Sequence, residues 1–167
     1  MADDFEDVSN FSLSAEREKE LYKKQTECTF MWTNKAGEPV GVIMNYVVRD
    51  GSFWLTATRR RARIAAIERD PRVAIAISSR GTDIGVSQSV THKGIAAVHD
   101  DPGTKDWFYP ALAAAVRPDS DEHQRAFVDH LDSPGRVVIE VSPTQRIGFD
   151  SELMLRDSPA GMSRSQL

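Results

Sequence analysis

The segment from Gly51 to Ser79 constrains the fold of this chain more than any other, because it joins three structural signals. The aromatic and β-branched run at 53–58 suits a half-buried strand. Apolar residues then recur one helical turn apart over 60–69, and the Asp-Pro pair at 70–71 ends that pattern, since a residue before proline disfavours the α region. Residues 73–77 resume as a strand. The segment therefore predicts a strand, a short helix docked by one face, and a second strand.

Four arginines stand where the first of these strands runs into the helix: Arg59, Arg60, Arg61 and Arg63. Their charge is repelled by the positive end of the helix dipole. A bound anion would relieve that repulsion and would also use the free N–H groups of the first helical turn. We therefore predict that this junction is the phosphate-holding end of a cofactor site. A solvated arginine face is the alternative.

The composition of the chain limits which partners it is expected to bind and in which compartment it is expected to function. The chain has 167 residues, which favours a single domain, and a net charge of −4, which argues against a general nucleic-acid binder. Cys28 is the one cysteine, so no internal disulfide can form and a reducing compartment is expected. No apolar run is long enough to span a membrane, and the acidic N-terminus is no signal peptide. The sequence predicts a cytoplasmic protein with neither nucleic acid nor membrane as a partner.

The order of elements predicts an α+β fold. Strands are expected at 27–33, 39–48, 53–58, 73–77 and 136–141. Residues 86–98 are expected to form one long strand or two, and 143–149 a further strand or turn. Helices are expected at 15–24, 60–69, 105–116 and 121–131. Gly41 is a possible bulge, and Gly94 marks a bend or bulge in a long strand. Consecutive hairpins indicate a closed antiparallel barrel of about six strands with peripheral helices. We expect an N-terminal arm and helix at 1–26, the barrel at 27–150, and a C-terminal tail at 151–167.

This order of motifs resembles the pyridoxamine 5′-phosphate oxidase-like split β-barrel proteins, which bind flavin or deazaflavin. The motifs are FWLTAT, RRRAR, DPRVAIAIS, KGIAAVHDD and RVVIEVSP, and the resemblance covers roughly Glu27 to Asp150. It implies a six-stranded, Greek-key-like split barrel that forms a homodimer with the cofactor at the interface. It also implies an oxidoreductase that moves hydride between FMN or coenzyme F-420 and a small conjugated substrate. The long C-terminal segment of the true oxidase has no clear counterpart, which argues against pyridoxamine phosphate as the substrate.

The resemblance also implies site residues. The family's phosphate-binding threonine matches Thr56, with Thr58 a close second, and its lysine matches Arg63. The family's arginine falls on Ala62, so Arg61 is the candidate to replace it. Contacts to the cofactor ring are implied for Met44 and Asn45, and for Gln88 or Ser89. Asn45 is neutral where relatives carry a basic residue. No catalytic side chain is expected, because the cofactor carries the hydride chemistry.

Other chemistry-bearing residues are assigned to structural roles. The histidines (His92, His99, His123 and His130) are scattered, so each is expected on the surface or the barrel rim, and no metal site is predicted. Some relatives bind haem, and a non-catalytic carrier of haem, flavin or another apolar ligand is therefore the alternative function. Cys28 is expected to be a small buried core residue. The tryptophans, Trp32, Trp54 and Trp107, are expected to fill a core or a dimer interface.

Overall fold

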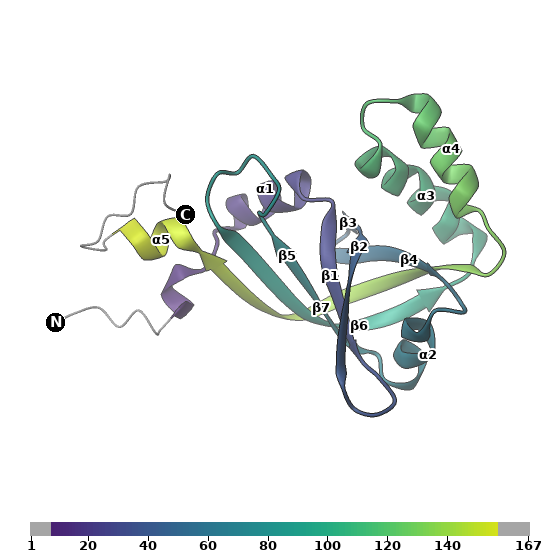
Figure 1. Ribbon diagram of the computed structural model, residues 1–167, viewed down its shortest axis with the longest axis horizontal. Coiled ribbons are helices and arrows are strands. Elements are labelled where there is room, and N and C mark those ends of the chain that lie inside the picture. The colour runs from purple at the N-terminus through teal and green to yellow at the C-terminus, as the bar shows by residue number, and fades with distance from the viewer. Residues whose placement is uncertain (1–7, 157–167) are drawn as a thin grey trace.

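The computed structural model describes residues 8–156, in which one antiparallel sheet carries several helices (Figure 1). The sheet has seven strands in the order β2-β1-β5-β6-β7-β4-β3. Its strands are β1 (Glu27–Thr33), β2 (Pro39–Asn45), β3 (Val47–Arg49), β4 (Ser52–Thr58), β5 (Arg72–Ser78), β6 (Gln88–His99) and β7 (Arg136–Asp150). The helices are η1 (Val8–Phe11), α1 (Ala15–Lys24), α2 (Ala62–Arg69), α3 (Pro102–Val116), α4 (Asp121–Leu131) and α5 (Ser151–Arg156).

The sheet curls because Tyr46 joins its two edges. β2 and β3 stand at opposite ends of the strand order, yet Tyr46 alone separates them in the sequence. The Tyr46 N–H donates to the Thr26 carbonyl at 3.2 Å, and the ring is buried in the core. The single strand predicted over 39–48 is therefore wrong, and the half-barrel has seven strands rather than six.

β6 and β7 form the longest pairing, which contains the predicted irregularity at Gly94. The register shifts between Lys93 and Gly94, which face Gln145 and Pro143, so Thr144 is an extra residue in β7. A Cβ on Gly94 would meet the Ser142 carbonyl oxygen at 2.6 Å, which explains the glycine. Pro143 cannot donate a backbone hydrogen bond to the neighbouring strand, and a bulge is a place in a sheet where proline is tolerated. Residues 143–149 are thus a strand. The possible bulge at Gly41 is wrong, because that residue pairs with Met31 in regular register.

Two apolar clusters lie on opposite faces of the sheet. The inner cluster fills the curl of the sheet with side chains such as Phe30, Leu55 and Ile75, and α2 docks into it through Ile64 and Ile67. The outer cluster lies under α3 and α4 and comprises Phe108, Tyr109, Leu112, Leu131 and Val138. Because β7 is covered on both faces here, residues 137–139 are all buried and read as an unbroken apolar run.

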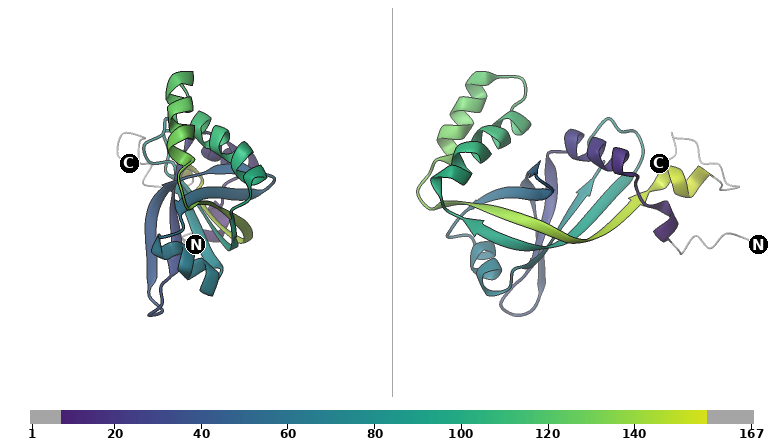
Figure 2. Two further views of the ribbon diagram at one scale, coloured as in Figure 1. Left: turned by 90° about the vertical axis from the view of Figure 1, so that its right-hand side faces the viewer. Right: turned by 180° about the vertical axis from the view of Figure 1, so that it is seen from behind.

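Helices lie at both ends of the molecule. α3 and α4 project at one end, and η1 and α5 lie at the other (Figures 1 and 2). α1 begins after Ser14, whose hydroxyl accepts the Arg17 N–H and so caps the helix. α3 begins at Pro102, three residues before the predicted start, with Asp101 as its cap. Part of the predicted C-terminal tail forms α5, and the rest, with residues 1–7, lies outside the described residues. The described helices include none that is long and apolar enough to cross a membrane.

Candidate functional site

The junction of β4 and α2 holds the predicted phosphate-binding residues. β4 alternates, so Phe53, Leu55 and Ala57 face the core while Thr56 and Thr58 face outward. The Thr56 hydroxyl donates to the Val137 carbonyl at 2.8 Å. The Thr58 carbonyl accepts the Arg61 N–H at 2.9 Å, which closes the turn into the helix. Thr56 therefore keeps only acceptor capacity, whereas no hydrogen bond of the Thr58 hydroxyl is found within residues 8–156.

The start of α2 is an uncapped helix N-terminus with unbalanced positive charge. Arg61 occupies the capping position, no side chain caps the first turn, and that turn carries no acidic residue in the described structure. Arg63 is half-buried, and its guanidinium carbon lies 5.6 Å from the centre of the Trp32 ring. Its Nε is buried and has no hydrogen-bond partner in the described part of the chain. Burial, and then the charge of Arg61, lower the pKa of Arg63. This arrangement favours an anion.

The other two arginines of the run differ from each other. Arg59 forms ion pairs with Asp100 at 2.9 Å and Glu68 at 3.4 Å, so its charge is already balanced. Its backbone N–H donates to the Gly135 carbonyl at 2.7 Å. Arg60 is exposed. Of the two, Arg59 has a structural role and Arg60 alone is available to a ligand.

Met44 and Asn45 end the edge strand β2, next to the place where the sheet splits. The Met44 side chain packs against the inner core, and Asn45 donates from Nδ2 to the Thr26 carbonyl at 3.2 Å. β3 pairs with β4 through Val47 and Trp54, so the same register carried back along the chain sets Asn45 level with Thr56. We call the split of the sheet between the ends of β2 and β4, with the start of α2 beyond it, the gap; Arg63 lies over Trp32, which pairs with Val40 at the other end of β2 from Asn45.

Gln88 and Ser89 lie far from the β4–α2 junction, whereas the strand registers set Ser89 in one cross-strand row with Ser78, Glu27 and Asn45. Thr58 pairs with Arg136 and Ser89 pairs with Phe149, near opposite ends of β7. At ~3.3 Å per residue these positions are roughly 40 Å apart along the strand. Gln88 is 3% exposed and faces inward, where its Nε2 donates to Asp150 at 3.3 Å. Ser89 is on the outer face. The structure thus does not bring all the predicted site residues together in one chain.

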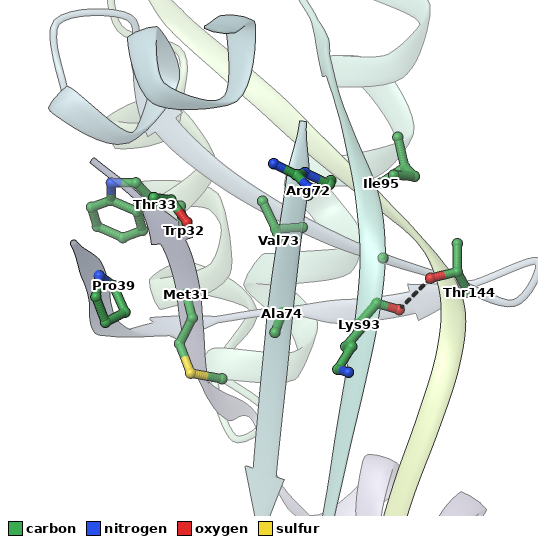
Figure 3. A pocket seen from close by; sticks show the side chains of 11 residues that line it. Met31, Trp32, Thr33, Pro39, Arg72, Val73, Ala74, Lys93, Ile95 and Thr144 are labelled. Atoms are coloured by element: carbon green, nitrogen blue, oxygen red, sulfur yellow. Dashed lines mark hydrogen bonds between the residues drawn. The ribbon is translucent and has the colours of Figure 1, made fainter. Parts of the chain in front are cut away.

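The outer face of the sheet carries an apolar hollow of about 430 Å³ (Figure 3). Met31, Ala74 and Ile95 line it, with Lys93 and Arg72 at its sides. Trp32 also contributes, so the hollow adjoins the ring beneath Arg63. Exposed apolar side chains continue across the same face at Ile43 (64% exposed), Ile95 (44%) and Ile147 (51%). None of the predicted site residues lines the hollow.

A buried polar cluster inside the barrel mouth was missed by the sequence reasoning. His92 is 6% exposed, so its expected place on the surface or rim is wrong. Its Nε2 lies 2.5 Å from the Tyr22 hydroxyl, which donates its only proton to Glu18, so the imidazole is the donor to Tyr22. Glu18 also binds Arg146. Burial lowers the pKa of His92. The sequence feature that indicates this burial is the alternation of β6, which puts the His92 side chain on the same face as that of Val90.

The remaining candidates have structural roles. Cys28 is buried as predicted, and burial raises the pKa of its thiol to about 12. Trp32 belongs to the inner core, and Trp54 packs edge-to-face on Trp107 in the outer cluster, with ring centres 4.9 Å apart. His99 contacts Glu140 at 3.0 Å, whereas His123 and His130 are exposed on α4. Within residues 8–156, no group of three or more His, Cys, Asp or Glu side chains could hold a metal ion.

The chain matches the family model described as pyridoxamine 5′-phosphate oxidase over residues 15–148, and it belongs to this family. No curated protein matches it in sequence. Among solved structures it is similar to the conserved hypothetical protein Rv2991 from Mycobacterium tuberculosis. The identity is 18% and the TM-score 0.75, and the match covers 87% of this chain and 90% of the other.

Two further similar structures belong to proteins that are named for a function. One is an F-420 reductase, with 19% identity and a TM-score of 0.56, covering 77% of this chain and 94% of that one. The other is HutZ, the haem storage protein from Vibrio cholerae, with 11% identity and a TM-score of 0.60, covering 81% and 94%. At these identities the likeness shows the fold: an antiparallel, curled half-barrel of the α+β class.

Proposed function

We propose that this protein is an oxidoreductase that uses FMN or coenzyme F-420 to transfer hydride to or from a small conjugated substrate. The observation that carries the proposal is the buried Nε of Arg63, which has no hydrogen-bond partner among residues 8–156 and lies at the uncapped start of α2. Both cofactors present a ribityl phosphate, which suits a guanidinium and free helix N–H groups. The membership of the chain in a family that includes such oxidoreductases supports the same assignment.

The residues along the gap would contact successive parts of the cofactor, from its phosphate to its ring. Arg63, Arg61 and the Thr58 hydroxyl would hold the phosphate, whereas the Thr56 hydroxyl would have to turn away from the Val137 carbonyl before it could donate to a phosphate oxygen. The backbone edge of β2 near Met44 and Asn45 would lie along the ring, because within residues 8–156 β2 pairs with β1 alone. When bound, the ring supplies the hydride chemistry, so these residues bind and orient rather than exchange protons.

A homodimer would complete the site. Ser89 is too far along the sheet to reach the phosphate end of the site in its own chain, and the exposed apolar face around Ile43, Ile95 and Ile147 suits a second copy. A second chain on this face would cover the hollow and could bring its own Ser89 toward the gap. Gln88 is a poorer candidate, because it is committed to Asp150.

The test is a titration of the purified protein with FMN, with F-420 and with haemin, followed by fluorescence or absorbance. We expect tight binding of FMN or F-420. The Arg63→Gln variant should weaken it by at least about tenfold, because a hydrogen bond to a charged group contributes ~1.5–3 kcal/mol. Arg80→Gln, which removes an exposed arginine elsewhere, is the matched control.

Two results would overturn the proposal. Equal affinities of the Arg63 and Arg80 variants would remove the phosphate assignment. Binding of haemin alone would favour a non-catalytic haem carrier, with an exposed histidine such as His123 or His130 as the candidate ligand.

A further inference from the structure

Three buried hydrogen-bonding atoms near the start of β7 lack a partner in the described chain: Tyr109 Oη, Ser133 Oγ and Arg136 Nε. They belong to one region. Ser133 and Arg136 share a turn, in which the Ser133 carbonyl accepts the Arg136 N–H at 3.0 Å. Tyr109 packs in the outer cluster with Leu131 and Val138, which lie two residues before and after this turn. The region lies between α3 and the connection from α4 to β7.

All three atoms can donate a hydrogen bond. The Nε of arginine only donates. Burial raises the pKa of Tyr109, so its phenol keeps its proton, and the Ser133 hydroxyl can turn to suit a partner. Buried donors without an acceptor are rare in native proteins. A group of donors beside a fixed positive charge is complementary to an oxyanion.

The charge of Arg136 is the one left unbalanced in this region. Lys105 and Arg59 both bind Asp100, at 2.6 Å and 2.9 Å, so their charges are neutralised. Within the described residues Arg136 forms no ion pair. Asp132 is exposed, so water screens its effect on an anion.

The region borders a surface hollow and adjoins the β4–α2 junction. Tyr109 lines an open hollow of about 380 Å³ between α3 and α4, together with Lys105, Asp106 and Asp132, whereas Ser133 and Arg136 lie behind it. Arg136 is the cross-strand partner of Thr58, and both side chains lie on the outer face of the sheet. Arg63 lies beyond that pair, at the start of α2.

We infer that Tyr109, Ser133 and Arg136 form a second oxyanion-binding site, distinct from the phosphate site at Arg63. It takes a phosphate or carboxylate group, carried either by the anionic tail of the deazaflavin cofactor or by a substrate. Arg136 supplies the charge, and the two hydroxyls supply neutral hydrogen bonds.

The test follows the Nε–H signals of arginine by NMR while inorganic phosphate is added to the full chain. The Arg136 signal is identified by its loss in Arg136→Gln, and the exposed Arg80 serves as the reference. We expect a saturable shift of the Arg136 signal, with an affinity at least about tenfold weaker in the Tyr109→Phe, Ser133→Ala double variant. An Arg136 signal that stays fixed, or that only drifts in parallel with Arg80, would show that water alone satisfies these donors and would overturn the site.

A second arm identifies the source of the oxyanion and rests on the proposed function. If the group is the cofactor tail, Arg136→Gln weakens F-420 binding about tenfold and leaves FMN binding unchanged. If it belongs to a substrate, neither cofactor affinity changes while phosphate still shifts the Arg136 signal. Failure of the wild type to bind either cofactor would contradict the proposed function, and the phosphate titration would still decide the second site.

Discussion

Individual polar side chains near the gap differ in whether the folded chain already supplies their hydrogen-bond or ion-pair partners. Arg59 is balanced by Glu68 and Asp100, and the Thr56 hydroxyl is bound to Val137. Arg63 has a buried Nε without a partner in the described chain. Since an unsatisfied buried donor is unfavourable, Arg63 gains most from a ligand. A run of arginines in a sequence therefore contains residues of different roles, which only their contacts separate.

His92 should make stability depend on pH. Burial lowers its pKa in the folded protein, an effect that the nearby Glu18 partly opposes and Arg146 reinforces. The unfolded chain keeps a pKa of about 6.5, so below that pH it binds the proton before the folded state does. The free energy of unfolding should thus fall as the pH decreases from about 7 to about 5. Urea unfolding across this range measures it.

The control for this prediction is His92→Gln, which removes the titrating group and keeps a polar side chain. Carboxylates elsewhere titrate in both proteins, so the difference between the two pH profiles isolates His92. Parallel profiles would contradict the role assigned to the buried imidazole.

Among the secondary-structure elements, β7 depends on the bulge opposite Gly94. An alanine Cβ there would meet the Ser142 oxygen at 2.6 Å and Val141 Cγ1 at 2.8 Å, and neither can move without disturbing the strand. We expect Gly94→Ala to destabilise the protein by about 1–3 kcal/mol, as overpacking does. Denaturant unfolding measures the loss. Gly103→Ala is the control, because a Cβ there meets only the Asp101 side chain at 3.4 Å; it should be neutral or slightly stabilising.

Helix α1 is held over the barrel mouth by charged contacts. Arg17 binds Asp150, which is fully buried, and also Glu152 at 2.6 Å. Arg17→Ala would leave the Asp150 charge with Gln88 as its remaining side-chain partner. We expect a loss of about 2 kcal/mol, less than for a fully buried pair because Arg17 is partly exposed. Hydrogen exchange should quicken in α1 first.

The control for α1 is Lys19→Ala, which removes an exposed charge on the same helix. Protection of α1 amides that is the same in both variants would show that apolar contacts of Leu21 and Leu13, rather than the Arg17 contacts, hold this helix in place.

Much of this element-level structure is predictable from local patterns. The hairpins follow from the turn residues, since Gly37, Asp50 and Gly51 all adopt positive φ. Helices α1 and α4 span their predicted residues, 15–24 and 121–131, and a capping serine precedes each of them. The break at Tyr46 depends on its contact with Thr26, and the burial of His92 depends on α1 docking over the mouth. These are long-range effects, which a local reading of the chain does not contain.

The same limit applies to the candidate site. The arginine run and the helix start were visible in the sequence, and the resemblance supplied Thr58 and Arg63. The separation of Ser89 from that group follows only from the pairing of β6 with β7. The unpartnered donors of Tyr109 and Arg136 come from segments that meet only in the folded chain.

At the scale of the whole molecule, the exposed outer face of the sheet suits a homodimer. Ile147→Glu places a charge at the β7 side of the exposed apolar surface that also includes Ile43 and Ile95. We expect the wild type to run as a dimer and this variant to shift to monomer at micromolar concentrations, because burial of an unpaired charge opposes association. Size-exclusion chromatography with light scattering measures the mass.

Val48→Glu is the matched control, since Val48 is also exposed but lies on the edge strand β3. It should leave the dimer intact. A monomeric wild type, or equal effects of the two variants, would place the interface elsewhere and remove the argument that a second chain completes the site.

The central claim is that the start of α2 holds the phosphate of a flavin-type cofactor, and a crystal structure of the protein with FMN or F-420 tests it most directly. We expect a phosphate oxygen at about 2.7–2.9 Å from Arg63 Nε, with the ring along the end of β2. A phosphate bound away from α2, with Arg63 Nε still unpartnered or bonded to water, would contradict the account.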